Sequence, residues 1–106
     1  MLSSFFSKCQ YDLDGHHFKT EYNKSRDNLL LDVRTIAEYK SGSLSKALHA
    51  DYFSPSFLPL IEQLQKDKTY FVFCRAGNRS SSAVNIMRKM GFNAYNLNGG
   101  IGEWPK

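Results

Sequence analysis

A short apolar run that leads through a compact loop into a helical pattern constrains the fold of this chain more than any other feature. Residues 70–73 are aromatic or β-branched, which indicates a buried strand. Apolar side chains recur at spacings of three and four between residues 82 and 90, which predicts an amphipathic helix that ends at Gly91. Cys74 follows the strand directly. It should therefore stand at the carboxyl end of a central strand, where open α/β sheets place their ligands.

The loop between this strand and helix, residues 74–80, has the composition of an anion-binding cradle. Gly77 permits left-handed backbone angles, so successive N–H groups can converge on one centre. The helix that follows adds free N–H donors and the positive end of its dipole. Arg75 and Arg79 add two permanent charges. A thiolate is the form stabilised in such surroundings, so the loop predicts an activated nucleophile at Cys74.

Two further motifs flank this loop in the sequence. They are Leu31-Asp32-Val33-Arg34 with Glu38-Tyr39 and Gly42, and Leu97-Asn98-Gly99-Gly100-Ile101 with Trp104. Together with Cys-x-x-Gly-x-Arg-Ser at residues 74–80, they resemble the motifs of the rhodanese family of sulfurtransferases in order and spacing. The resemblance covers nearly the whole chain. The family usually carries Gly-His-Ile and then Gly-Ala-x-Asn where this sequence has Gly42-Ser43-Leu44 and Lys46-Ala47-Leu48-His49.

The resemblance implies that Cys74 takes a sulfane sulfur from an anionic donor, thiosulfate or a persulfide, and passes it to cyanide or a thiol. It requires no metal and no organic cofactor, and it makes thioredoxin or another protein thiol a candidate acceptor. We expect Ser80 to be the helix N-cap and its hydroxyl to donate a hydrogen bond within the site. Six loop residues would bind the substrate: Arg75, Ala76, Gly77, Asn78, Arg79 and Ser80.

Two other functions are compatible with a reactive cysteine in such a loop. A rhodanese-fold phosphatase or arsenate reductase also combines a cysteine, a backbone cradle and an arginine, but its loop has five residues between the two. Only four residues separate Cys74 from Arg79, which favours sulfur over a tetrahedral phosphate. A domain that senses redox state or binds a partner is the third hypothesis, because an exposed thiol of low pKa is readily oxidised.

Asp32 interrupts an apolar run at residues 29–33, near the end of a second expected strand. An unpaired buried carboxylate is costly, so Asp32 should accept hydrogen bonds from nearby backbone or from an arginine. Two roles remain open for it: support of the active-site loop and a cap for the following turn. Arg34 is assigned a supporting role as well. Its spacing of four from Glu38 predicts an ion pair across a short helix.

The remaining chain alternates between strand and helix patterns. This alternation predicts an α/β fold, a rhodanese-like domain with a four- to five-stranded, mostly parallel sheet and helices on both faces. The domain should span residues 1–106, with a core at about 10–105. We also expect a strand at residues 11–13 with Asp12 facing water, an N-cap at Asp14, a last strand at residues 94–97, and Trp104 as a core plug. A second helical region at residues 54–65 should carry one apolar stripe, with an irregular lead-in and a regular helix from about Pro59. The stripe consists of Phe57, Leu60, Ile61 and Leu64.

Charge and length narrow the classes of partner. The net charge is +4 without any dense tract of Lys and Arg, which favours small anions over nucleic acid. No stretch approaches the about 20 apolar residues of a membrane helix, and the first eight residues hold no signal-peptide pattern. We therefore expect a cytoplasmic protein that does not bind membranes. No pattern indicates an oligomeric state.

Four other reactive side chains carry weaker expectations. Cys9 is expected to be a bystander thiol, with the resolution of an oxidised Cys74 as the alternative. His16 and His17 have no partners at metal-ligand spacing and should lie on the surface. His49 is expected to pack or to lie on the surface, with a place at the rim of the site as the alternative.

Overall fold

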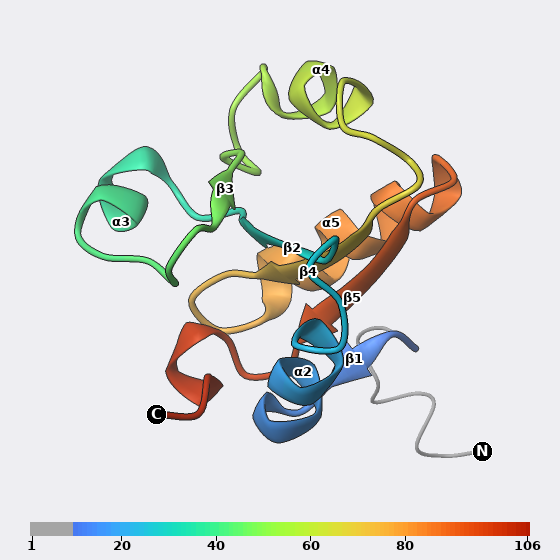
Figure 1. Cartoon of the computed structure of the whole chain (residues 1–106). Coiled ribbons are helices and arrows are strands. Elements are labelled where there is room, and N and C mark those ends of the chain that lie inside the picture. Colours follow the sequence, from blue (N-terminus) through green and yellow to red (C-terminus); the bar gives the residue numbers. More distant parts are fainter. Residues whose placement is uncertain (1–9) are drawn as a thin grey trace, which may run out of the picture.

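A five-stranded parallel sheet forms the centre of the protein (Figure 1). The computed structural model describes residues 10–106. The strand order is β1-β5-β4-β2-β3, which places the strand before Cys74 in the middle, as the sequence predicts. The strands are β1 (Asp12–Leu13), β2 (Leu29–Asp32), β3 (Leu48–His49), β4 (Thr69–Phe73) and β5 (Asn93–Leu97).

Helices cover both faces of the sheet, which confirms the predicted layers. They are α2 (Gly15–Tyr22), α3 (Ile36–Lys40), α4 (Phe57–Glu62) and α5 (Asn78–Lys89), with a 3₁₀ helix, η1 (Ile101–Glu103). Alternate side chains of β4 enter two different clusters, because successive residues of a strand point to opposite faces. Tyr70 and Val72 pack with residues of α4 and α5, whereas Phe71 and Phe73 pack with Phe18 of α2.

The short helix α2 and the residues near the carboxyl terminus close the second face. The Asp14 side chain accepts a hydrogen bond from the His17 backbone N–H at 2.9 Å, so the predicted N-cap is confirmed. Both His16 and His17 are exposed. Trp104 meets Phe18 edge to face at 6.1 Å but stays half-buried, so it covers this cluster rather than plugging it.

Two element boundaries differ from the sequence prediction. Helix α5 begins at Asn78 with Gly77 as its N-cap, so Ser80 lies inside the first turn and is not the cap. Helix α4 begins at Phe57 rather than near Pro59. Pro59 is tolerated at its third position because the N–H groups of the first turn have no helical partner to lose.

Two side chains are placed differently from their sequence prediction. Leu60 was expected in the buried stripe of α4 but is 43% exposed, because this helix presents Phe57 and Ile61 to the core. Asp12 was expected to face water, yet its carboxylate accepts a hydrogen bond from the Asn96 side-chain amide at 2.8 Å. The pairing of β1 with β5 places Asp12 opposite Asn96, a partner 84 residues away that periodicity does not reveal.

Candidate active site

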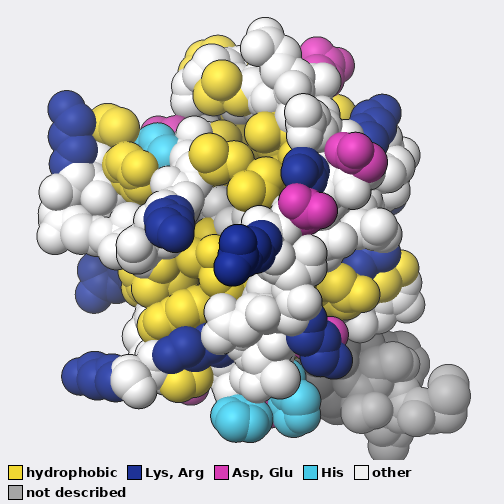
Figure 2. All heavy atoms as spheres, in the orientation of Figure 1, with side chains coloured by type: hydrophobic (Ala, Val, Ile, Leu, Met, Phe, Trp, Pro, Cys, Tyr) yellow, Lys and Arg dark blue, Asp and Glu magenta, His cyan; other side chains and the backbone are white. Residues whose placement is uncertain are grey.

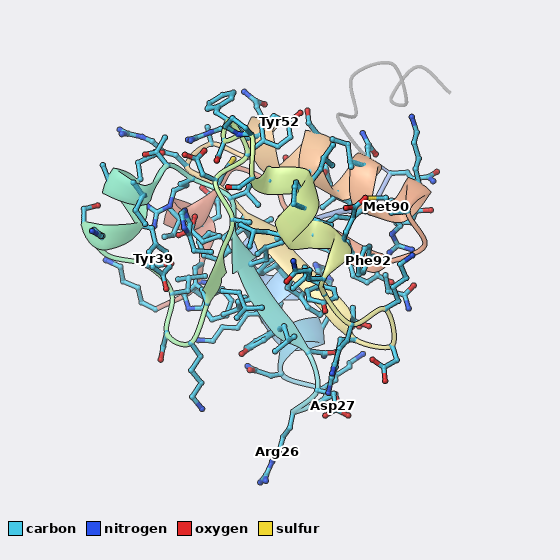
Figure 3. The ribbon with its side chains drawn as sticks, turned by 90° about the horizontal axis from the view of Figure 1, so that it is seen from above. Arg26, Asp27, Tyr39, Tyr52, Met90 and Phe92 are labelled. Atoms are coloured by element: carbon cyan, nitrogen blue, oxygen red, sulfur yellow. The ribbon has the colours of Figure 1, made fainter. Side chains whose placement is uncertain are left out.

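Cys74 lies at the carboxyl edge of the sheet, directly after β4. In Figure 3 this is the end marked by Tyr52, opposite the end where Arg26 and Asp27 precede β2. The backbone around Cys74 is held from two sides. The Val33 N–H donates to the Phe73 carbonyl at 3.0 Å, and the Ile101 N–H donates to the Cys74 carbonyl at 2.8 Å. The position of the cysteine is therefore fixed by a neighbouring strand and by the turn before η1.

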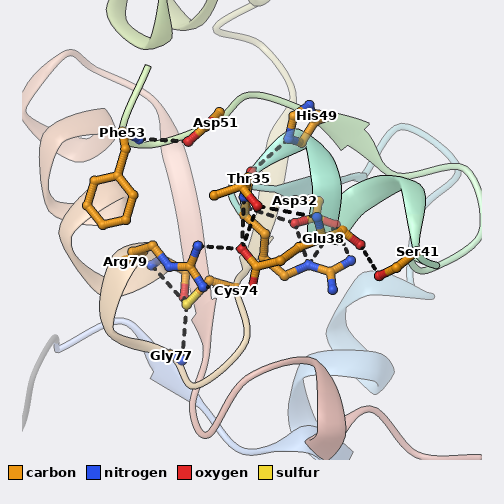
Figure 4. A network of polar contacts seen from close by, with 12 residues as sticks. Asp32, Thr35, Glu38, Ser41, His49, Asp51, Phe53, Cys74, Gly77 and Arg79 are labelled. Carbon is orange, nitrogen blue, oxygen red and sulfur yellow. Dashed lines mark hydrogen bonds and ion pairs between the residues drawn. The ribbon is translucent and has the colours of Figure 1, made fainter. Parts of the chain in front are cut away.

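Three hydrogen-bond donors converge on the sulfur of Cys74 (Figure 4). The Gly77 backbone N–H lies 3.1 Å from Sγ, the Ser80 backbone N–H lies 3.4 Å away, and the Ser80 hydroxyl lies 3.3 Å away. The expected contribution of the Ser80 hydroxyl is thus present, although Ser80 is not the cap. The cysteine is only 1% exposed. Donors aimed at a buried sulfur stabilise a negative charge on it.

The balance of these contacts lowers the pKa of Cys74. Burial raises the pKa of the thiol, but hydrogen bonds from the Ser80 hydroxyl and from the N–H groups of Ser80, Gly77 and Ala76 outweigh it. The net direction is below the ordinary value for a cysteine. The thiolate, which is the nucleophilic form, is therefore more abundant near neutral pH than for a free cysteine.

Two glycines shape the cradle. Gly77 has φ = 98°, a left-handed conformation that turns its N–H towards the sulfur while its carbonyl accepts from the Ser81 N–H at 3.1 Å. Gly100 has φ = 88°, and a Cβ built at this position would overlap the Arg75 backbone. The last Gly-Gly motif of the sequence is thus packed directly against the cysteine loop.

Replacing Ser80 with alanine is expected to raise the pKa of Cys74, because one donor to the thiolate is lost. Alkylation of Cys74 by iodoacetamide near neutral pH should slow by roughly 3- to 10-fold, and the acid limb of its pH profile should move to higher pH. At a pH well above the pKa of Cys74 in both proteins, the alkylation rates of the wild type and of Ser80→Ala should converge. Ser82→Ala is the matched control, because Ser82 lies exposed on the same helix. An unchanged profile for Ser80→Ala would contradict this role.

The two arginines of the loop have different surroundings. Arg79 forms a two-point ion pair with Glu38, from Nη1 to Oε1 at 2.7 Å and from Nη2 to Oε2 at 3.1 Å. Arg75 is exposed and has no ion-pair partner within residues 10–106. The sequence-based prediction of an Arg34–Glu38 ion pair is therefore wrong. Arg34 pairs with Asp32, two residues before it, whereas Glu38 pairs with Arg79, which the fold brings close.

Asp32 and Arg34 form a buried pair beside β2. The Arg34 side chain donates to both carboxylate oxygens of Asp32, with a shortest distance of 2.7 Å, and the Arg34 N–H donates to Oδ1 at 3.0 Å. Ser43 Oγ also donates to Asp32 at 2.7 Å, and Arg34 Nη2 reaches the Gly42 carbonyl at 2.7 Å. Asp32 thus caps the turn after β2, and within residues 10–106 its carboxylate is hydrogen-bonded to Arg34 and Ser43 rather than to the cysteine loop.

The other residues singled out in the sequence lie in different places. Ala76 and Asn78 are exposed on the cysteine loop. His49 stacks on Tyr39 with ring centroids 4.5 Å apart, and its Nε2 lies 2.7 Å from the Arg34 carbonyl, so it packs as expected. Cys9 lies outside the described residues, and its role stays a prediction. Within residues 10–106, no cluster of three or more His, Cys, Asp or Glu is placed to hold a metal ion.

Two side chains beside Cys74 were not identified from the sequence as part of the site. Glu38 reaches Arg79 across 41 residues, and Phe53 places its ring 5.7 Å from the Arg79 guanidinium carbon. Thr35-x-x-Glu38 has the pattern of a capping box, and the structure forms that box at the start of α3. The pattern indicates where Glu38 lies on its helix, but it does not indicate that Glu38 also pairs with Arg79.

The chain is similar to known proteins over most of its length. The family model described as Rhodanese-like domain matches residues 17–106. A sulfurtransferase from Allochromatium vinosum is 29% identical over 97 residues, which are 90% of this chain and 88% of that protein. The putative sulfurtransferase YtwF from Bacillus subtilis is 31% identical over 87 residues, which are 81% of this chain and 82% of that protein.

Longer proteins and solved structures show the same similarity. The tRNA uridine(34) hydroxylase of Sodalis glossinidius is 35% identical over 101 residues and 87% of this chain, yet the chain spans 29% of that protein. The crystal structure of a rhodanese-like domain protein from Staphylococcus aureus has a TM-score of 0.79 at 23% identity, covering 92% of this chain and 93% of the other. That likeness shows the fold. Among the residues described here, no helix is long and apolar enough to cross a membrane.

Proposed function

Because the chain belongs to the rhodanese-like domain family, we propose that it is a sulfurtransferase that carries sulfur as a persulfide on Cys74. The observation that carries the proposal is the convergence of the Gly77 N–H, the Ser80 N–H and the Ser80 hydroxyl on one buried sulfur. The named relatives of similar length support the broader sulfurtransferase role. The donor, the acceptor and the persulfide are parts of the proposal.

The proposed first step is the attack of the Cys74 thiolate on the sulfane sulfur of the donor. With thiosulfate, a bond forms between Sγ and the outer sulfur, the S–S bond of thiosulfate breaks, and its electron pair leaves with sulfite. The negative charge then lies on the outer sulfur of the persulfide. Backbone N–H groups of residues 75–80 would stabilise that charge, and Arg75 would attract the donor from its exposed position.

The proposed second step returns Cys74 to the thiolate. A nucleophile such as cyanide, a low-molecular-weight thiol or a protein thiol such as thioredoxin attacks the outer sulfur. The bond between the two sulfurs breaks, and its electron pair remains on Sγ. The donors that stabilise the resting thiolate also stabilise this leaving group, so the same hydrogen bonds serve both steps.

Phosphatase or arsenate reductase chemistry is the competing enzymatic function. The four residues between Cys74 and Arg79 make a loop one residue shorter than the phosphatase loop. In addition, Arg79 already makes a two-point ion pair with Glu38, which offsets the charge that a phosphate would need. Both observations support sulfur transfer over phosphoryl transfer.

The mass of the intact, reduced protein after incubation with thiosulfate or an organic persulfide tests the proposal. We expect a gain of one sulfur atom that cyanide removes as thiocyanate and dithiothreitol removes as sulfide. The Cys9→Ser variant should gain the same sulfur, because Cys9 is the other cysteine of the chain. Absence of the adduct with both donors, together with turnover of p-nitrophenyl phosphate or arsenate, would transfer the assignment to the competing chemistry.

A further inference from the structure

The Arg79 guanidinium stands beside Cys74 but is engaged on several sides (Figure 4). Glu38 binds its edge through two contacts of 2.7 and 3.1 Å, and the Phe53 ring lies against it with 5.7 Å between the guanidinium carbon and the ring centroid. The side chain of Arg79 is 19% exposed and that of Glu38 is 26% exposed. The pair is therefore partly shielded from water, where an ion pair is screened less than on an open surface.

Negative charges lie close to the positive charge of Arg79. Its hydrogen bonds to Glu38 raise the pKa of Arg79 against the opposing effect of burial, and the charges of the Cys74 thiolate and of Asp51 raise it further. The charge of Arg79 is thus paired with the Glu38 carboxylate, and the Cys74 thiolate and Asp51 add further negative charge near it. A charge balanced in this way attracts an incoming anion weakly.

Glu38 is held in place independently of Arg79. Its carboxylate accepts hydrogen bonds from the Thr35 N–H at 2.9 Å and from the Thr35 hydroxyl at 3.1 Å. Its pKa is lowered to about 2, first by the hydrogen bonds from Arg79 and then by the Thr35 backbone N–H. Glu38 therefore stays ionised at any pH at which sulfur transfer would be assayed. Its charge is a permanent part of the site.

We propose that Glu38 determines which sulfur donors the site accepts: by pairing with Arg79 it disfavours the small dianion thiosulfate relative to an organic persulfide. The inference rests on the proposed function and specifies its donor class. Thiosulfate brings two negative charges close to the reacting sulfur, whereas an organic persulfide brings one. Pairing with Glu38 balances the charge of Arg79, and the attraction lost in this way is about twice as large for a dianion as for a monoanion at the same distance. Phe53 is 70% exposed and adds apolar surface that an organic group can contact and a sulfite group cannot.

The transfer from an organic persulfide balances without any further reactant. The Cys74 thiolate attacks the terminal sulfur of the donor, and a bond forms between Sγ and that sulfur. The donor's S–S bond breaks, and its electron pair leaves with the donor's inner sulfur as a thiolate, which takes a proton from water. The products are the Cys74 persulfide and the free organic thiol.

Glu38→Gln is the variant that tests the inference. Glutamine also serves in a capping box, so the start of α3 should be retained while the charge is lost. We expect kcat/KM for thiosulfate to rise on the order of tenfold, mainly through a lower KM. For the persulfide of 2-mercaptoethanol, whose one charge is on the terminal sulfur, the rise should be only about threefold, since half the charge gives half the energy.

Glu62→Gln is the matched control, because it makes the same change of net charge at an exposed position of α4. It should alter neither reaction by more than about twofold. The rate gain of Glu38→Gln with thiosulfate should also shrink as the ionic strength increases. Urea unfolding of each variant checks that the fold is intact.

A double-mutant cycle with Arg79→Met assigns the effect to the ion pair. In the Glu38→Gln background, removal of Arg79 should cancel the gain with thiosulfate, because the freed guanidinium is what attracts the dianion. A fall or no change in thiosulfate kcat/KM for Glu38→Gln, an equal gain with both donors, or a gain that survives without Arg79 would overturn the inference. If the wild type forms no persulfide with either donor, the proposed function itself fails, which is a distinct outcome.

Discussion

Cys74→Ser is expected to abolish sulfur transfer, with the rate of thiocyanate formation from thiosulfate and cyanide falling by more than about a thousandfold. The hydroxyl of serine is far less acidic than the thiol and forms no persulfide, so both proposed steps lose their nucleophile. The mass of the variant should not change after incubation with thiosulfate. Retained transfer at more than a few per cent of the wild-type rate would refute the role of Cys74.

Serine is the appropriate replacement because it preserves the loop around position 74. Its oxygen can accept hydrogen bonds from the Gly77 and Ser80 N–H groups that now point at the sulfur. The urea midpoint of the variant should therefore stay near that of the wild type. Cys9→Ser is the matched control for chemistry, and full activity is expected for it because the donors in the described loop converge on Cys74.

Asp32→Ala is expected to destabilise the protein by about 3–5 kcal/mol. Asp32 is fully buried, and Arg34 is nearly so, with 7% of its side chain exposed. The hydrogen bonds to Asp32 raise the pKa of Arg34, and that support is lost with the carboxylate. An arginine nevertheless stays protonated in a protein, so its charge would remain. A buried guanidinium without its partner is the cause of the predicted loss. Urea or thermal unfolding followed by circular dichroism measures it.

A total stability of about 5–15 kcal/mol is usual for a domain, so a loss of this size can leave Asp32→Ala largely unfolded at 37 °C. A second variant therefore keeps the prediction testable. Asp32→Ala combined with Arg34→Met removes both charges and should recover much of the loss. Glu21→Ala is the control, because it removes only the exposed pair with Lys24 and should cost no more than about 1 kcal/mol. If Asp32→Ala lowers the free energy of unfolding by less than about 1 kcal/mol, the Asp32–Arg34 pair adds little to stability.

Charged and apolar side chains are intermingled on the protein surface (Figure 2). On the face shown in Figure 2, Lys and Arg side chains are spread separately among apolar and acidic ones. The large apolar side chains with substantial exposure include Phe53 beside Arg79 and Ile36 at the start of α3. The segment that holds Phe53 follows β3, and helix α3, which begins at Ile36, follows β2. Both therefore lie beyond the carboxyl ends of strands, at the edge of the sheet that carries Cys74.

The sequence by itself determined the central strand, the cysteine loop and the helix after it. Strand and helix periodicities are local, and the left-handed angle at Gly77 is encoded by the residue type. The approach of the Ser80 hydroxyl to Cys74 could be anticipated for the same reason, since only five residues lie between them. The boundary of α5 was misplaced because a serine is a common N-cap, whereas here the left-handed glycine takes that position.

Only the tertiary structure decided the pairing of Glu38 with Arg79. An arginine partner for Asp32 was among the sequence-based expectations, and Arg34 lies only two residues after it. Arg34 was paired with Glu38 on helical spacing, yet Asp32 binds Arg34 and Arg79 binds Glu38. The parallel order of β2 beside β4 brings the loops after both strands to one edge of the sheet, which joins Glu38 to a residue 41 positions later. Coulombic attraction depends on distance in space and on burial, and neither is written in the local pattern of a sequence.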